Sequence, residues 1–333
     1  MKHVFVINSH TTFLTSMGVV DYLRIYSDDV IFIYVRNYKN SVSRIDYACY
    51  DCTNLSDSCA NIADGYSGKI ANVDTFVSQN IRERYCLYVP HLWHWFHQIL
   101  YTNKLCCRVS YVQEGGPAQT KVYITDVSLI ECIKSYIRLA ILKHRIFETK
   151  WYIKGCIYKQ LRLDSYAIND VYFDNLPSVN HIVKWPRADI KLHINSKLPI
   201  FIFDGHIANG TVEPDIYIQA CERIIKQYAC VENYVKFHPA QRSEEREKIL
   251  DLFIENGYRT DVMTDDIPTE YIILQFSKLT FVGFTSSLLY YAQDNHHNVI
   301  CCEDELILNS MKYRKHINEC GFMTFRQTYK NGV

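Results

Sequence analysis

The sequence lacks several features that identify whole classes of protein. Its 333 residues carry 36 Lys and Arg against 36 Asp and Glu, so no net charge favours binding to nucleic acid. No run of about 18 apolar residues occurs, so we expect no membrane-spanning helix. The first ten residues form an apolar stretch that is too short and wrongly flanked for a signal peptide. We therefore expect a cytoplasmic protein with no nucleic-acid partner.

A zinc site is also missing, although cysteine is plentiful. The chain has 13 cysteines, and Cys49 and Cys52 form a CxxC pair. A structural zinc site needs a second such pair, or a pair of histidines, at matching spacing, and none is present. Free thiols scattered along a chain are typical of a reducing compartment. The adjacent acids at 28–29 and 265–266 lie in predicted turns, and we interpret both pairs as surface residues rather than metal ligands.

What the sequence does contain is two series of strands that alternate with helices. Apolar stretches typical of strands occur in both halves of the chain, and the apolar pattern weakens between them, over residues 180–197, which we interpret as a linker. This alternation predicts α/β structure with parallel sheets. We expect two Rossmann-like domains, 1–185 and 186–333, that face a central cleft, with the C-terminal segment packed back on the first domain. In the second half, Pro214 is expected in the first turn of one helix, and the next helix is expected to have a Ser243 cap and a terminal Gly257.

Residues 128–163 form a basic segment with helical character. Eight Lys and Arg residues are interleaved there with Tyr, Phe and Trp. A basic aromatic helix of this kind can lie on an anionic membrane surface. The alternative is a solvated helix face with ordinary packing on its other side.

Polar residues follow three predicted strands. Glu114 precedes a Gly-Gly pair, His238 precedes Pro239, and a Ser-Ser pair at 286–287 begins a helix. Ligands of parallel α/β sheets bind outside the carboxyl ends of the strands. A carboxylate there can act as a general base, and an imidazole can stabilise a departing phosphate. Hydroxyls and free amides at a helix N-terminus bind phosphate. Taken singly, each feature is more often a turn, a loop or a helix cap.

Together, in this order, the three motifs resemble those of a known family. Gln113-Glu114-Gly115, His238-Pro239 and Ser286-Ser287 are similar to the acidic-Gly, His-Pro and Ser-Ser motifs of bacterial sialyltransferases of the two-domain GT-B type. That group includes the lipooligosaccharide and polysialic-acid enzymes. The resemblance implies an inverting transfer from CMP-sialic acid to a sugar hydroxyl, without a metal or other cofactor.

The resemblance also implies roles for the motif residues. Glu114 is expected to be the base that deprotonates the acceptor, and His238 to stabilise the departing CMP phosphate. The Ser286 and Ser287 hydroxyls are expected to hold that phosphate, with Pro239 beside it. This chain departs from the family at Gln113, where the first acid usually stands, so Glu114 alone can serve as the base.

Further candidates follow from position. On the donor side these are Gly205 after the first strand of the second domain, Lys236, and Glu270 near the ribose. On the acceptor side they are the first-loop residues Ser9, His10 and Thr11, with Gln113 and Gly115. For each of them, an ordinary loop or capping role is the alternative.

We thus predict a sialyltransferase that acts on a terminal galactose, with α-2,3 linkage, of a bacterial surface glycan or its lipid-linked precursor. The products would belong to O-antigen, capsule or lipooligosaccharide synthesis. The protein itself would make peripheral contact with the inner membrane. A GT-B transferase that uses CMP-Kdo or a UDP-sugar is the alternative enzyme. A non-catalytic glycan-binding or assembly protein is the alternative class. Homodimerisation stays open.

Overall fold

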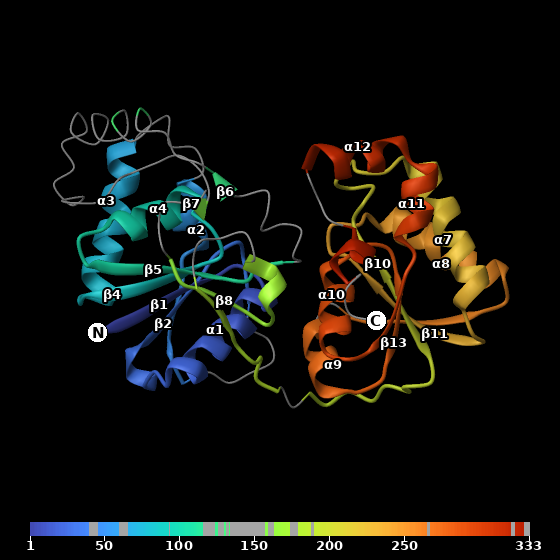
Figure 1. Ribbon diagram of the computed structural model, residues 1–333, viewed down its shortest axis with the longest axis horizontal. Coiled ribbons are helices and arrows are strands. Elements are labelled where there is room, and N and C mark those ends of the chain that lie inside the picture. Colours follow the sequence, from blue (N-terminus) through green and yellow to red (C-terminus); the bar gives the residue numbers. More distant parts are fainter. Residues whose placement is uncertain are drawn as a thin grey trace. The chain divides into compact units, whose positions relative to one another are not determined.

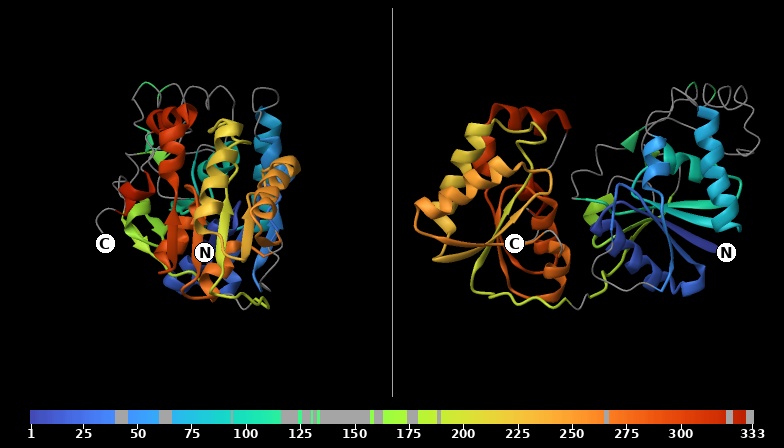
Figure 2. Two further views of the ribbon diagram at one scale, coloured as in Figure 1. Left: turned by 90° about the vertical axis from the view of Figure 1, so that its right-hand side faces the viewer. Right: turned by 180° about the vertical axis from the view of Figure 1, so that it is seen from behind.

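The computed structural model describes residues 1–39, 46–59, 66–92, 94–115, 124–125, 130, 133, 157–158, 163–173, 179–187, 190–264, 267–320 and 324–329. The chain forms two compact units (Figures 1 and 2). The first is built on Met1–Gly115 and Tyr123–Pro186, and the second extends over Arg187–Val333.

The first unit contains a parallel sheet of seven strands in the order β3-β2-β1-β4-β5-β8-β9. Its first strand in the sequence, β1, pairs with β2 on one side and with the central strand β4 on the other. The helix α1 contacts β1, β5 and β8, whereas α2, α3 and α4 contact one another. The elements are β1 (Lys2–Ile7), α1 (His10–Leu23), η1 (Ser27–Asp29), β2 (Val30–Tyr34), β3 (Ala48–Asp51), α2 (Thr53–Ser58), α3 (Tyr66–Phe76), η2 (Val77–Ile81), β4 (Tyr85–Val89), α4 (Trp95–Thr102), β5 (Cys106–Val112), β6 (Ile124–Thr125), β7 (Ile157–Tyr158), β8 (Ser165–Ala167), η3 (Asp170–Phe173) and β9 (Asn180–Ile182).

The second unit contains a parallel sheet of five strands in the order β12-β11-β10-β13-β14. The chain starts at the centre, moves out to one edge and then crosses to the other, which is the Rossmann order. Helices α7 and α11 contact each other, and α9 contacts α10. The elements are β10 (Pro199–Phe203), α7 (Pro214–Tyr228), β11 (Glu232–Phe237), α8 (Ser243–Glu255), β12 (Arg259–Val262), α9 (Thr269–Gln275), β13 (Thr280–Gly283), α10 (Ser287–Asp294), β14 (Asn298–Cys301), α11 (Glu303–Asn309), α12 (Met311–Cys320) and α13 (Phe325–Thr328).

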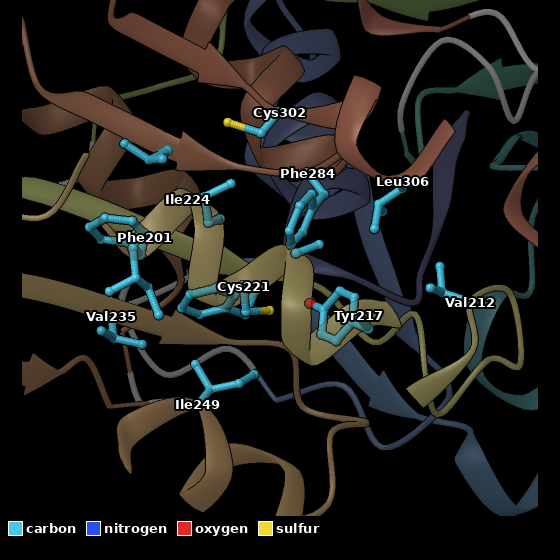
Figure 3. Packing of buried hydrophobic residues seen from close by; sticks show 14 of the residues in the cluster. Phe201, Val212, Tyr217, Cys221, Ile224, Val235, Ile249, Phe284, Cys302 and Leu306 are labelled. Carbon is cyan, nitrogen blue, oxygen red and sulfur yellow. The ribbon is translucent and has the colours of Figure 1, made fainter. Parts of the chain in front are cut away.

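One hydrophobic core of the second unit lies between one face of its sheet and the helices α7, α8 and α11. Figure 3 shows Tyr217, Cys221 and Ile224 of α7 among side chains of the strands and of α8 and α11. The strands β10 and β13 are apolar along nearly their whole length because both faces of this sheet are covered. The predicted parallel α/β architecture is thus observed in both units.

Local sequence signals predict some helix boundaries and miss others. Pro214 occupies the first turn of α7, as expected from its fixed φ angle. Gly257 follows α8 with φ of +78°, a conformation that favours glycine. The expected Ser243 cap of α8 is wrong, because Arg242 is the N-cap residue and Ser243 is already helical.

Another sequence expectation, for the region between the two units, also differs from the structure. Residues 180–182 form β9 at the edge of the first sheet rather than a linker. Their apolar pattern is weak because an edge strand is partly exposed, as Ile182 is at 56%. The described part of the C-terminal segment contacts α10 of its own unit, where Phe325 and Tyr329 pack on Tyr290, and its packing on the first domain stays a prediction.

The basic segment 128–163 lies almost entirely outside the described residues, so the prediction of a membrane-surface helix stays a prediction. Within the described ranges, no helix has the length and apolar character needed to cross a membrane.

Candidate active site

Glu114 lies in the first unit, two residues beyond the end of β5, and it is surrounded by groups from three neighbouring strand ends. Its Oε1 atom accepts a hydrogen bond from Asn8 Nδ2 at 2.5 Å and another from an Arg36 guanidinium nitrogen at 3.2 Å. Its Oε2 atom lies 3.5 Å from His91 Nε2. Because β2, β1, β4 and β5 are adjacent in the sheet, residues that follow these strands meet at one edge.

The raised proton affinity of Glu114 suits a general base. Burial raises the pKa of this carboxyl above its ordinary value, while Arg36 and the hydrogen bond from Asn8 oppose that rise. A carboxylate with a raised pKa is a stronger proton acceptor than an exposed one. The side chain nevertheless keeps 26% of its surface exposed, so a substrate hydroxyl can approach it.

Arg36 is held at the site by an unusual turn. Arg36 and Asn37 both have positive φ angles, 57° and 55°, which non-glycine residues rarely adopt. The Asn37 amide donates to Thr53 Oγ1 at 3.0 Å, which anchors the turn. Two strained residues in succession after β2 are the kind of backbone cost that is concentrated at functional sites.

His91 is buried beside Glu114 and is neutral. Burial lowers the pKa of His91 well below its ordinary value, and the neighbouring His97 and His94 lower it further. The His91 and His97 rings lie 4.8 Å apart, and His97 Nδ1 is 2.8 Å from the His91 carbonyl oxygen. His91 therefore presents a dipole, not a positive charge, to the carboxylate.

The residues predicted on the acceptor side divide into several kinds. Gln113 is buried with 1% exposure, and its Oε1 accepts from the Ile168 amide at 3.0 Å, so it joins β5 to the end of β8. Successive residues of an extended chain point to opposite sides, which explains why Glu114 faces the site and Gln113 does not. The other members lie as follows: Ser9 is the N-cap of α1, His10 packs edge-on against Tyr38, Thr11 is buried in α1, and Gly115 is half-buried.

His238 lies in the second unit, directly after β11, and its backbone and ring are both held. Its amide donates to the Phe203 carbonyl at 2.9 Å and to Gln241 Oε1 at 2.8 Å. Its Nδ1 accepts from the Ala240 amide at 3.1 Å. Since Nδ1 accepts, the proton of the neutral ring must be on Nε2. The Nε2–H group is therefore the donor that His238 can offer to a ligand.

Asp204 and Gly205 follow the central strand β10 and lie against His238. Asp204 Oδ1 is 3.8 Å from His238 Nε2 and accepts from the Gly205 amide at 2.7 Å. A Cβ atom on Gly205 would lie 3.0 Å from His238 Nδ1. Glycine at this position thus allows the imidazole to lie close to the end of β10.

Ser286 and Ser287 begin α10 at the carboxyl end of β13. Ser286 is the N-cap residue, and its Oγ atom accepts from the Leu288 amide at 3.4 Å. Ser287 is the first helical residue. In the sheet, β11 and β13 flank β10 on either side. His238, Gly205 and Ser286 therefore follow three adjacent strands at one edge of the second sheet. The sequence predicted that each of them follows a strand, and their roles in binding the donor stay predictions.

The remaining donor-side candidates lie on different elements of the second unit. Lys236 is buried within β11, and its Nζ donates to the Thr264 carbonyl at 3.2 Å, beyond the end of β12. Glu270 lies in the first turn of α9, and Pro239 is exposed next to His238. Among the described residues, no group of three or more His, Cys, Asp or Glu side chains is placed to hold a metal ion.

Sequence reasoning missed Asn8, Arg36 and His91. A usable signal existed, because each of them follows a strand: β1, β2 and β4 respectively. The rule that identified Glu114 and His238 applies to these strand ends as well. What the sequence does not show is which strands are neighbours.

Comparison with known proteins gives a family match over part of the chain. Residues 159–300 match the model of the family described as alpha-2,8-polysialyltransferase (POLYST). The matched stretch includes His238-Pro239 and Ser286-Ser287, and it leaves residues 1–158, with Glu114, outside. No curated protein has a sequence that matches this chain.

Solved structures resemble the chain at low sequence identity. The S. aureus MnaA–UDP structure has a TM-score of 0.51 and 10% identity, with 90% of this chain and 79% of that chain covered. The sialyltransferase from Photobacterium damsela has a TM-score of 0.47 and 13% identity, with 96% and 79% covered. The spinosyn rhamnosyltransferase SpnG, complexed with thymidine diphosphate, has a TM-score of 0.46 and 10% identity, with 96% and 85% covered. At such identities the likeness concerns the fold alone, which is the GT-B fold of two Rossmann-like units with parallel sheets.

Proposed function

We propose that this protein is a sialyltransferase that moves sialic acid from CMP-sialic acid to a sugar hydroxyl with inversion. One observation carries the proposal: the polysialyltransferase match includes both the His-Pro and the Ser-Ser motif, and these follow β11 and β13 on either side of β10. A nucleotide phosphate at the carboxyl edge of such a sheet would meet His238 Nε2–H and the N-terminus of α10.

In the proposed reaction, Glu114 takes the proton of the acceptor hydroxyl. The hydroxyl oxygen then attacks the anomeric carbon of sialic acid, and the bond from that carbon to the CMP phosphate oxygen breaks. The phosphate keeps the electron pair, and His238 Nε2–H and the Ser286 and Ser287 groups stabilise the resulting charge. A neutral Nε2–H donor is sufficient for this role, so the proposal does not require a protonated imidazole.

The acceptor is the least constrained part of the proposal, and two candidates are defined. The first is a terminal galactose that receives an α-2,3-linked sialic acid, on a bacterial surface glycan or its lipid-linked precursor. The second is a glycan that already ends in sialic acid, which the description of the matched family favours. That match leaves out residues 1–158, and these include Glu114, the proposed base.

Other parts of the proposal concern location and partners. Action from the cytoplasm at the inner membrane rests on the basic segment 128–163. A lipid-linked acceptor would bring the substrate to that surface, and a homodimer is compatible with either acceptor. Binding of the protein to vesicles that contain anionic lipid tests the membrane contact directly.

The function is tested by incubating the purified protein with CMP-sialic acid and either a galactose-terminated or a sialic-acid-terminated acceptor, with EDTA present. Sialylated product and released CMP are measured for the wild type and for Glu114→Ala and His238→Ala. We expect metal-independent transfer by the wild type and a loss of at least about a hundredfold in each variant, since acid–base groups contribute that much.

Three results would redirect or refute this proposal. Turnover of CMP-Kdo or a UDP-sugar, with none of CMP-sialic acid, would keep a GT-B transferase and change its donor. Nucleotide binding without turnover of any donor would favour a non-catalytic glycan-binding or assembly protein. Full activity in His238→Ala would refute the proposed role of His238, at the end of β11, in stabilising the departing phosphate.

A further inference from the structure

A chain of hydrogen bonds leads from the N-terminus of α1 to the Glu114 carboxylate. Ser9 Oγ accepts from the Thr12 backbone amide at 3.1 Å, which is an ordinary helix cap. Ser9 Oγ and Thr12 Oγ1 are 2.9 Å apart, and Thr12 Oγ1 donates to Asn8 Oδ1 at 2.8 Å. Asn8 Nδ2 then donates to Glu114 Oε1 at 2.5 Å.

The direction of each bond in this chain is determined by chemistry. Asn8 Oδ1 can only accept, so the Thr12 hydroxyl must use its proton there. Thr12 Oγ1 then has no proton left for Ser9, so the Ser9 hydroxyl is the donor of that pair. A flipped Asn8 amide would place its oxygen 2.5 Å from a carboxylate oxygen, a repulsive contact. The helix cap therefore sets which face of the Asn8 amide is turned toward Glu114.

The two carboxylate oxygens consequently differ. Oε1 receives N–H groups from Asn8 and from Arg36, whereas Oε2 has His91 Nε2 at the longer distance of 3.5 Å. A proton that arrives on Oε1 would displace a donor, whereas one that arrives on Oε2 would not. Among the described residues, Arg36 and His91 are the charged or titratable side chains that contact Glu114, and burial keeps His91 neutral.

We propose that Asn8, oriented by the hydroxyls of Ser9 and Thr12, is a positioning residue that holds Glu114 by Oε1 and leaves Oε2 to accept the proton of the acceptor hydroxyl. This inference rests on the proposed role of Glu114 as the base. It gives Ser9 a function in arranging the base through the cap of α1, in place of the direct acceptor contact expected from the sequence.

The sharpest test is a matched pair of substitutions at Thr12, which is buried with 0% exposure. Thr12→Val keeps the shape of the side chain and removes the hydroxyl that orients Asn8. Thr12→Ser keeps the hydroxyl. We expect Thr12→Val to lower kcat about two- to tenfold, the equivalent of one hydrogen bond, with little change in KM. Thr12→Ser should have a kcat close to that of the wild type.

The pH profile separates positioning from a merely structural effect. A hydrogen bond to the carboxylate favours its charged form, so loss of the Asn8 bond should raise the pKa of Glu114. The acidic limb of kcat/KM should therefore move to higher pH in Thr12→Val and return in Thr12→Ser. Asn8→Asp should move the limb further, because two carboxylates in contact share one proton.

A titration without turnover keeps this inference separate from the proposed function. Carbon-13 NMR of labelled glutamate carboxyls, with Glu114 assigned by Glu114→Gln, reports its pKa in the full-length protein. A higher pKa in Thr12→Val than in Thr12→Ser supports the inference even if no donor is turned over. Equal pKa values in the two variants, with near-ultraviolet circular dichroism that shows both folded, would overturn it.

Discussion

Replacement of Gly205 by alanine perturbs His238 without touching it directly. The new Cβ atom would lie 3.0 Å from His238 Nδ1 and 3.6 Å from Ala240 Cβ. The contact with the ring is tighter than ordinary van der Waals packing, so the imidazole must shift by a few tenths of an ångström. Gly205 is not among the residues with positive φ, so alanine adds no backbone strain.

The expected loss follows from the bond that the ring would give up. His238 Nδ1 accepts from the Ala240 amide at 3.1 Å, and this bond keeps the proton on Nε2. A neutral hydrogen bond contributes about 0.5–1.5 kcal/mol, which corresponds to a decrease of about two- to tenfold in kcat/KM. Thermal stability should change little, because the ring is 43% exposed and has room to move.

The assay is CMP release with saturating acceptor, measured for four proteins: wild type, Gly205→Ala, His238→Ala and the double variant. If Gly205 acts through the ring, its substitution should have no further effect when His238 is already alanine. Gly68→Ala is the control, since a Cβ atom added to Gly68 in α3 would have no neighbouring atom within 4 Å. That change should leave transfer unaltered and stabilise the helix by about 0.5–1 kcal/mol. Equal effects of Gly205→Ala in both backgrounds would refute the reasoning.

Three further predictions concern stability and reactivity. Gly283→Ala places a Cβ atom 2.5 Å from the Ile202 carbonyl oxygen of the paired central strand, so urea unfolding should show a loss of about 1–3 kcal/mol. Glu114→Gln should abolish transfer and raise the melting temperature at pH 7. Burial raises the pKa of Glu114 in the folded state, so the wild type loses stability as pH rises through that pKa. The difference in melting temperature between variant and wild type should therefore vanish at acidic pH, where Glu114 is protonated. A thiol reagent at pH 8 should label the exposed cysteines of the described part first, before buried Cys52, whose pKa burial raises to about 12. Mass spectrometry should identify these as Cys49, Cys107 and Cys230.

The sequence was sufficient for the architecture of the second unit because its signals are local. The alternation of apolar strands with helices, and Pro214 in the first turn of α7, depend on residues a few positions apart. His238 could be identified as a strand-end residue for the same reason, since β11 ends at Phe237. The prediction of a helix cap at Ser243 was wrong because several residues near position 243 are compatible with the first turn. Local preference does not choose among them.

The tertiary structure decided which residues surround Glu114. Asn8, Arg36 and His91 are far from it in the sequence, and they meet it because β2, β1, β4 and β5 are neighbours in the sheet. That strand order results from long-range pairing, which no periodicity within a strand encodes. The sequence by itself therefore determined which residues end a strand. Only the folded sheet determined which of these strand ends lie together, because parallel strands acquire their neighbours through crossover connections.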